Sequence, residues 1–404
     1  MDFMTDKAPA LPFKIIASGC LIILLSFGPR SAMGLYQIPL LADTGWDRST
    51  FGLALAIQNL CWGLGQPFFG SIADKYGAGR VLVSSAVFYI SGLSLMAYAS
   101  APIWLHIGAG LLIGLGVAAA SFSVILAIFA RNVAPEKRSI AFGLATAFSS
   151  LSMFLFSPFS QYLISQFGWQ DALLWTSGLI LLVPLLATQL RGNSASSTNA
   201  KNQYEQSVAQ ALKEAYAHKS YVLLTAGFFV CGFQVAFITV HFPAYIADIG
   251  IDATYAVLAL TLIGFFNIIG SLGSGVLGQK YSKPHLLSYI YFGRAVLITL
   301  FLIIPQTPLT IIIFASIMGI LWLSTVAPTN ALIPVMFGTR HMGLLGGLVF
   351  LSHQVGSFIG VYAGGVLFDI YKSYDPIWWA SVALGIFAGF VHLPIKEEPV
   401  LRPA

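Results

Sequence analysis

Charged residues are scarce in this chain of 404 residues. Only 9% of them are Asp, Glu, Lys or Arg, whereas 57% are hydrophobic and the mean hydropathy is +0.82. A soluble domain is about a quarter charged, so the composition excludes an ordinary soluble protein and indicates an integral membrane protein. The net charge of +5 comes from bases spread through polar connections, and this spacing argues against nucleic acid as a partner.

Signatures of catalysis are also missing. The three cysteines (Cys20, Cys61 and Cys231) lie in apolar segments, which excludes a disulfide framework or a metal-binding spacing. The chain has no Walker A loop and no serine nucleophile elbow. We therefore expect a protein without cofactor or metal that is not an enzyme. Asp2 and Asp6 precede an apolar run too long for a signal peptide, so we expect no cleaved leader.

Long apolar runs are what the sequence has in abundance. About 20 apolar residues cross a bilayer core as a helix. The runs predict twelve such helices, near residues 13–38, 50–72, 80–99, 102–130, 139–165, 170–190, 221–245, 253–278, 285–304, 308–335, 341–367 and 376–395. The expected fold is an all-α integral membrane protein with two pseudo-symmetric bundles of six helices.

One long polar linker divides the chain. We expect a first bundle over 1–190, a linker over 191–220 with a surface helix within 203–217, and a second bundle over 221–404. The halves echo each other, since Gly70 and Lys75 recur as Gly275 and Lys280. Two matched halves around a midplane site are typical of secondary transporters.

The bases are distributed unequally between the two sides of the predicted bundle. An even number of helices puts both termini on one side, and sixteen of the twenty bases then share that side, with only Arg48 and Lys372 opposite. The positive-inside rule makes the side of the termini cytoplasmic. We expect a multi-pass protein of the inner (cytoplasmic) membrane with both termini in the cytoplasm.

A glycine-rich charged turn is predicted at residues 70–80, GSIADKYGAGR. Glycines suit a tight connection between two helices, and its charged side chains can pair with each other or with helix ends. The segment resembles the loop 2–3 signature of the major facilitator superfamily. That resemblance implies a gating role for Gly70, Asp74, Lys75, Gly77 and Arg80.

The predicted membrane interior contains a cation and no acid. All fifteen acidic residues map to loops or helix ends, while Arg30 falls inside the first helix. A charge at that depth costs at least about 3 kcal/mol unless it meets water or a partner. An organic anion is a natural partner, because guanidinium binds carboxylate through two parallel hydrogen bonds. The alternative is that Arg30 extends outward or bonds backbone carbonyls.

Several segments resemble the monocarboxylate transporter family and its bacterial YcxA-like branch. Pro29, Arg30 and Ser31 resemble the Pro-Lys-Ser of its first helix, whose lysine serves substrate binding and proton coupling. Residues 136–143 resemble its Arg-rich loop, and on this basis we include Arg138 among the gating residues. Further matches lie at residues 232–234, 241–243, 323–330 and 350–360.

The resemblance has one departure that bears on coupling. The family's Asp and Arg of the eighth helix correspond to Asn267 and Ser271 here. Histidine is then the titratable group left near neutral pH. His241 and His353 are candidates for substrate or proton binding, with a plain hydrogen bond between helices as the alternative for each.

The remaining site residues are neutral donors and one more arginine. We assign to substrate binding, besides Arg30 and the two histidines, Asn59, Gln234, Asn267, Thr325, Asn330 and Gln354. Each of these amides and hydroxyls is equally explained by a hydrogen bond between helices. Arg294 lies about nine residues into the ninth helix, and we expect it to pair at the cytoplasmic gate.

The function predicted from these observations is secondary active transport of a small, monocarboxylate-like organic anion by alternating access. Proton symport, with H+ as a second partner, is one mode of transport, and anion exchange and facilitated diffusion are the alternatives. The transporter is expected to function as a monomer in the lipid bilayer. The alternative is an efflux permease for a drug or secreted metabolite, although the Gly-Pro pattern of such pumps is replaced by residues 156–160, FSPFS. A receptor without transport has no sequence marker, and labelled-substrate counterflow would distinguish it.

Overall fold

The computed structural model describes residues 12–190, 206–338 and 340–400, and over these ranges it contains helices but no strands. Among these described residues, nine helical segments are long and apolar enough to cross a membrane. Two further crossings are α3 (Arg48–Tyr76) and α17 (Asp375–His392), which fall outside those nine. One of the nine, Ile140–Leu190, is two crossings joined at Gly168, whose φ is 82°. These described segments therefore make the expected twelve.

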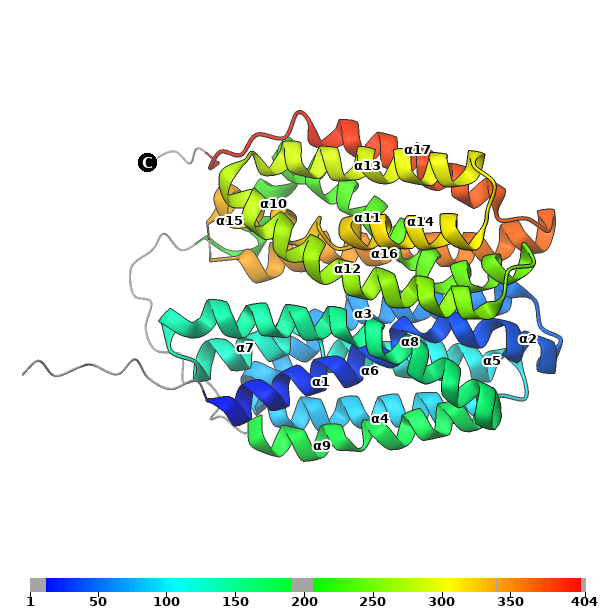
Figure 1. Ribbon diagram of the computed structural model, residues 1–404. Coiled ribbons are helices and arrows are strands. Elements are labelled where there is room, and N and C mark those ends of the chain that lie inside the picture. Colours follow the sequence, from blue (N-terminus) through cyan, green and yellow to red (C-terminus); the bar gives the residue numbers. More distant parts are fainter. Residues whose placement is uncertain (1–11, 191–205, 339, 401–404) are drawn as a thin grey trace, which may run out of the picture.

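The first six crossings form the N-terminal bundle, which occupies the lower half of Figure 1. Besides α3, its elements are α1 (Phe13–Ser31), η1 (Met33–Tyr36), α2 (Gln37–Thr44), α4 (Ala78–Ala97), α5 (Pro102–Leu105), the π-helical η2 (His106–Leu112), α6 (Ile113–Ala119), α7 (Phe122–Asn132), α8 (Pro135–Ile180), α9 (Leu182–Ala187) and η3 (Thr188–Leu190).

The other six crossings form the C-terminal bundle above it (Figure 1). Besides α17, its elements are α11 (Lys219–Asp248), α12 (Ala253–Lys280), α13 (Lys283–Ile303), α14 (Pro308–Leu321), α15 (Val326–Phe337) and α16 (Met342–Tyr371). A short helix, α10 (Val208–Ala217), precedes it, begins with a capping box at Ser207 and Gln210, and falls within the predicted surface helix. The rest of the predicted linker, residues 191–205, lies outside the described residues.

The start of α1 and the segment after α17 lie at the same end of the molecule, on the left of Figure 1. We call this the terminal end and the opposite one the distal end. The segment after α17 is held there by the backbone N–H of Val400, which donates to the Met336 carbonyl, and by Glu397, which pairs with Lys283. Large apolar side chains, among them Leu185 and Val276, are more than 60% exposed on the outside of the bundles, where lipid would cover them.

Four crossings that were each predicted as one helix are broken. The first is interrupted at Ala32, the fourth at Ala120 and Ser121, the sixth at Leu181, and the tenth at residues 322–325 between α14 and α15. Pro328 explains the last break, because its ring would clash with the carbonyl four residues earlier, at Ser324, if the helix continued. Broken helices at membrane depth are tolerated where they line a cavity or are buried in protein.

Glycine lets α11 and α16 pack backbone against backbone. A Cβ on Gly356, Gly360 or Gly364 would lie 2.0, 2.5 or 2.7 Å from the nearest atom of α11. Small residues four apart permit this approach between membrane helices. The two bundles then meet mainly where α3 packs on α16, as between Trp62 and Phe350, and where α8 packs on α12.

We expect Gly360→Ala to destabilise the protein, because the new Cβ would lie 2.5 Å from the Phe233 carbonyl oxygen. Overpacking of this kind costs about 1–3 kcal/mol. The measurement is the apparent melting temperature of purified protein in detergent. Gly273→Ala in α12 is the matched control, since its Cβ would meet nothing within 4 Å. Equal melting temperatures for the two variants would contradict this account of the packing.

Candidate substrate site and gates

Arg30 lies in the last turn of α1, immediately before the break in the first crossing. Its Nη2 donates to Asn59 Oδ1 at 2.6 Å, and its guanidinium lies over the Trp62 ring, 4.6 Å from the ring centre. Asn59 is held in turn by its own Nδ2, which donates to the Leu55 carbonyl at 2.8 Å. Arg30 is partly exposed, so the side chain is positioned by α3 without being enclosed by it.

Trp62 connects Arg30 to the C-terminal bundle. Its ring packs edge-on against Phe350 of α16, 5.1 Å between ring centres. Phe350 is stacked on His353 at 5.9 Å with an interplanar angle of 10°. Gln354 follows, and a Cβ on Gly63 would lie only 2.8 Å from its Cβ. Arg30 therefore lies where the two bundles meet, together with two of the predicted residues of the C-terminal bundle.

Three hydrogen-bond donors in this neighbourhood are buried without a partner. They are Arg30 Nε, Trp62 Nε1 and Gln354 Nε2. None of the three atoms can accept a hydrogen bond. The Gln354 carbonyl oxygen, in contrast, is used by His353 Nδ1 at 3.1 Å and by the Ser357 hydroxyl at 3.3 Å. The three donors thus lack a hydrogen-bond acceptor, and each unpaired buried donor costs about 1–3 kcal/mol of stability.

Asn267 also joins the bundles, but as a fully bonded residue. Its Nδ2 donates to Ser150 Oγ of α8 at 2.9 Å, and its Oδ1 accepts from the Leu323 N–H at the break in the tenth crossing. Its Oδ1 also accepts from Ser271, the second residue of the departure from the family pattern. The structure therefore gives Asn267 a role in joining α8, α12 and the helix break.

Thr325 and Asn330 lie on the tenth crossing at different exposures. Thr325 is fully buried, with its hydroxyl 3.2 Å from Cys231 Sγ. Asn330 is exposed and its Nδ2 donates back to the Val326 carbonyl at 3.1 Å. The contacts of these two side chains connect neither of them to Arg30.

Arg294 and Gln234 lie inside the C-terminal bundle, and Arg294 is not at the gate where the sequence placed it. Arg294 is 1% exposed. Its Nε and Nη2 donate to the Leu321 carbonyl at 3.1 and 2.7 Å, Nη2 also donates to the Trp322 carbonyl, and Nη1 donates to Gln234 Oε1 at 3.3 Å. The guanidinium thus binds the carbonyls freed where α14 ends, which the helix dipole makes negative.

His241 lies at the distal end, in a contact between the bundles. Its Nε2 is 2.8 Å from the Val361 carbonyl, so Nε2 carries the proton, because a carbonyl oxygen only accepts. Nδ1 is then the acceptor for the Tyr374 hydroxyl at 3.1 Å and for Gln37 Nε2 at 3.3 Å. The ring is fully buried and has no free position for a substrate in this state.

Sequence reasoning missed the strongest polar contact between the bundles. Arg48, at the start of α3, binds both carboxylate oxygens of Asp248 at 2.5 and 2.6 Å and stacks 3.6 Å above the Phe368 ring. The backbone N–H groups of Arg48 and Ser49 donate to Asp369 at 3.1 and 2.8 Å. The only signal in the sequence was that Arg48 is one of two bases expected on that side.

The loop 2–3 segment is more helical than predicted. Only Gly77, with a φ of 91°, interrupts the helices, whereas Gly70 lies within α3. The physical reason is that one left-handed residue suffices to turn between α3 and α4. Asp74 pairs with Arg131 at the end of α7, which the sequence did not predict, while Lys75 lies over Tyr76, 5.1 Å from the ring centre.

Two further bases complete the terminal end. Arg138 Nε donates to the Val133 carbonyl at 3.1 Å, just after the last residue of α7. Arg80 is exposed in the first turn of α4. Asp74, Arg80, Arg131 and Arg138 therefore lie on the helix ends of one bundle at the terminal end, where a gating role remains a prediction.

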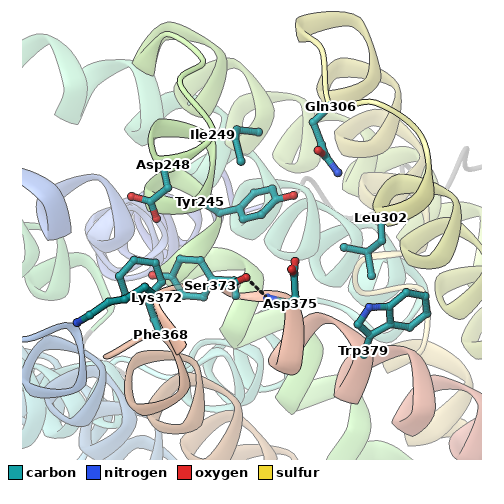
Figure 2. A pocket seen from close by; sticks show the side chains of 11 residues that line it. Tyr245, Asp248, Ile249, Leu302, Gln306, Phe368, Lys372, Ser373, Asp375 and Trp379 are labelled. Carbon is teal, nitrogen blue, oxygen red and sulfur yellow. Dashed lines mark hydrogen bonds between the residues drawn. The ribbon is translucent and has the colours of Figure 1, made fainter. Parts of the chain in front are cut away.

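A separate hollow of about 420 Å³ opens at the distal end of the C-terminal bundle. Figure 2 shows Tyr245, Asp375 and Trp379 around it, with Asp248 on one side. It shares Asp248 with the contact between the bundles, but none of the predicted site residues lines it. The hollow is therefore distinct from the Arg30 site.

We expect Arg294→Gln to lower the apparent melting temperature strongly. The substitution leaves the Leu321 and Trp322 carbonyls and Gln234 Oε1 without their buried donor, at about 1–3 kcal/mol for each such group. Arg131→Gln is the matched control, because its pair with Asp74 is solvent-exposed and contributes less than about 1 kcal/mol. A melting temperature for Arg294→Gln as high as that of the control would refute the assigned role.

Comparison with known proteins shows which family has this architecture. The family model of the Major Facilitator Superfamily matches residues 19–361. Monocarboxylate transporter 13 of Rattus norvegicus is 25% identical over 361 residues, covering 87% of this chain and 81% of the rat protein. The uncharacterized MFS-type transporter YcxA of Bacillus subtilis (strain 168) is 25% identical over 354 residues, covering 85% of each chain.

Solved structures agree in fold. The crystal structure of a D-xylose-proton symporter superposes with a TM-score of 0.74 at 15% identity, covering 97% of this chain and all of that one. A bacterial homolog of the human lysosomal transporter Spinster gives a TM-score of 0.71 at 12% identity, with 95% and 97% covered. The resemblance drawn from the sequence is confirmed: the chain is a multi-pass membrane protein and belongs to the Major Facilitator Superfamily, a family of transporters rather than enzymes.

Proposed function

We propose that this transporter carries a small organic anion of the monocarboxylate type through a site between the bundles centred on Arg30. The observation that supports this most is the group of three unpaired donors, Arg30 Nε, Trp62 Nε1 and Gln354 Nε2. A carboxylate is an acceptor with two oxygens and about four lone-pair positions. It would meet both the positive charge and the unused N–H groups, whereas a cation or an apolar solute would meet neither.

The surroundings of Arg30 suit a small anion with an apolar body. Asn59 holds Nη2 and leaves Nε to the ligand, so the guanidinium is oriented before the ligand arrives. Phe27 and Phe350 pack against the edges of Trp62 and supply apolar walls. The name of the similar rat protein, monocarboxylate transporter 13, points the same way, although it describes that protein alone.

Transport would follow from rocking the two bundles around this site. The bundles, over 1–190 and 221–404, would alternate about the linker over 191–220 and act as a monomer. Polar contacts between them at the distal end, such as Arg48 with Asp248 and Gln37 with His241, close that side in this state. By the positive-inside rule the terminal end is cytoplasmic in the inner membrane.

Proton symport is the coupling that we propose. His353 is a titratable side chain beside the anion site, because it stacks on Phe350 and hydrogen-bonds Gln354. A proton on His353 would add positive charge next to the bound anion and so favour joint binding. No carboxylate lies within the central part of any described crossing, so the histidine takes the place that acids have in other proton-coupled carriers.

We expect Arg30→Ala to abolish uptake of organic anions in proteoliposomes while expression stays intact. Wild-type protein should show a thermal shift with a panel of small carboxylic acids, because a ligand that binds only the folded state stabilises it. Arg30→Lys keeps the charge and loses the fork of donors, so it should retain weakened binding. Normal uptake by the alanine variant would overturn the proposal.

The unpaired donors allow a finer test. Trp62→Phe keeps an aromatic wall and removes the N–H, and we expect about a tenfold weaker apparent affinity for the carboxylate, corresponding to about 1.4 kcal/mol. Gln354→Glu replaces a donor by a negative charge and should weaken anion binding further. Trp379→Phe, at the separate distal hollow, is the matched control. If Trp62→Phe and Trp379→Phe bind anion equally well, the indole does not contact the substrate.

A further inference from the structure

The distal contact between the bundles is built as a directed chain of hydrogen bonds. Arg48 Nη1 donates to the Tyr374 hydroxyl at 2.9 Å, the Tyr374 hydroxyl donates to His241 Nδ1 at 3.1 Å, and His241 Nε2 donates to the Val361 carbonyl at 2.8 Å. Arg48 belongs to the N-terminal bundle and the other three to the C-terminal one. The direction follows from the two ends, since a guanidinium only donates and a carbonyl only accepts.

From this geometry we infer that the distal gate is a proton-sensitive latch, in which Arg48 and Asp248 form the clasp and His241 is the group that must stay neutral for it to close. The inference concerns the gate and stands independently of which solute is carried.

The clasp spans the bundles at several points in one place. Arg48 binds Asp248 through both carboxylate oxygens, and the two side chains are 13% and 30% exposed, so water reaches the pair only in part. Asp369 of α16 accepts from two backbone N–H groups at the start of α3, where the helix dipole favours a negative charge. Opening the distal side must break all of these bonds together, so the clasp stabilises the closed state.

The contacts of the closed state fit the neutral form of His241. With Nε2 donating to Val361, a second proton at Nδ1 would face the donors of Tyr374 and Gln37 instead of receiving their hydrogen bonds. To accept from a charged His241, Tyr374 would have to turn its hydrogen away and accept from Arg48 and His241 at once, and Gln37 would have to turn its amide over to present Oε1, which now has no partner. Protonation therefore breaks the chain at its centre.

The charged groups around His241 do not compensate for the hydrogen bonds that its protonation would break. Arg48, on α3, is a cation and repels a charged ring. Asp369, on α16, and Asp248, at the end of α11, are anions. The oxygens of Asp369 already accept from the N-terminus of α3, and those of Asp248 accept from the Arg48 guanidinium. Tyr374 is the titratable neighbour before α17, and its hydroxyl is neutral near pH 7. By linkage, a proton that binds the open gate better than the closed one shifts the population toward the open gate.

The experiment measures the gate directly, without any solute. Two spin labels are attached at Ala42→Cys and Ala253→Cys, both exposed at the distal end and one on each bundle, after Cys20, Cys61 and Cys231 are replaced by serine. Distance distributions in lipid nanodiscs are recorded at about pH 7.5 and about pH 5.5, the range over which histidine titrates and carboxylates stay ionised. We expect acid to increase the long-distance, open population.

Variants separate the clasp from the proton sensor. Arg48→Gln and Asp248→Asn should each raise the open population about fivefold or more at pH 7.5, the lower end of usual coupling between states. His241→Gln should lose the response to pH, whereas His106→Gln, a histidine at the same end that contacts the Thr50 carbonyl, should keep it. Tyr374→Phe preserves the ring and removes the linking hydroxyl, so it should reduce the response.

Three outcomes would overturn the inference. Unchanged distances in Arg48→Gln and Asp248→Asn would show that the clasp does not hold the gate. A normal pH response in His241→Gln would exclude His241 as the sensor, and if that variant does not fold, a normal response in Tyr374→Phe decides the same point. Failure of the anion proposal would appear as normal uptake by Arg30→Ala with these distances unaffected, so the two failures are distinguishable.

Discussion

A guanidinium buried among apolar helices must find acceptors, and this requirement organises the protein at two places with opposite results. Arg294 finds them in the chain itself: two carbonyls at the end of α14 and the oxygen of Gln234. Arg30 finds one, Asn59, and keeps an unpaired Nε. The first arginine is a structural clamp that stabilises a broken helix. The second keeps one donor unpaired, and the proposed substrate site rests on that difference rather than on the presence of a buried cation.

The breaks in the crossings also depend on how buried polar groups find hydrogen-bond partners. Arg30 is the penultimate residue of α1, directly before the break at Ala32, and the break in the tenth crossing exposes the Leu323 N–H, which Asn267 binds from α12. A continuous helix would have used these backbone groups internally. Because the freed groups are bound by Arg294 and Asn267, the tenth crossing can be interrupted without unpaired polar groups in the membrane. Its break is thereby held in one geometry.

Much of the architecture was readable from the sequence because lipid imposes simple rules. Apolar length predicted all twelve crossings, and the loop at 70–80 predicted the superfamily. The position of Arg30 was also predictable, since a lone charge stands out in an apolar run. The contacts between side chains were not predictable. In the sequence His241 resembles a site residue, and only its contacts with Gln37, Tyr374 and Val361 give it a place in the distal gate.

Distant pairings were equally hidden. Arg48 and Asp248 are 200 residues apart, and Asp369 is 321 residues from Arg48. Each of these side chains lies at a helix end, where a charge is unremarkable, and no periodicity links them. The geometry of the break near Pro328 was hidden for a related reason: proline indicates that a helix is interrupted, but the clamp by Arg294, from another crossing, decides where the freed carbonyls are satisfied.

The proposed anion site and the proposed distal latch are connected by a short segment of the chain. From Arg30 the chain runs through η1 and α2 to Arg48, and both short helices are gripped by α11: a Cβ on Gly34 would lie 2.4 Å from the Thr239 carbonyl oxygen, and Gln37 bonds His241. A change in the angle of α1 at its break must therefore move the residues that hold the latch. For a bound anion to shift the gate, it must bind one state more tightly than the other. The link through η1 and α2, which α11 contacts at Gly34 and Gln37, is the part of the structure that would couple the two.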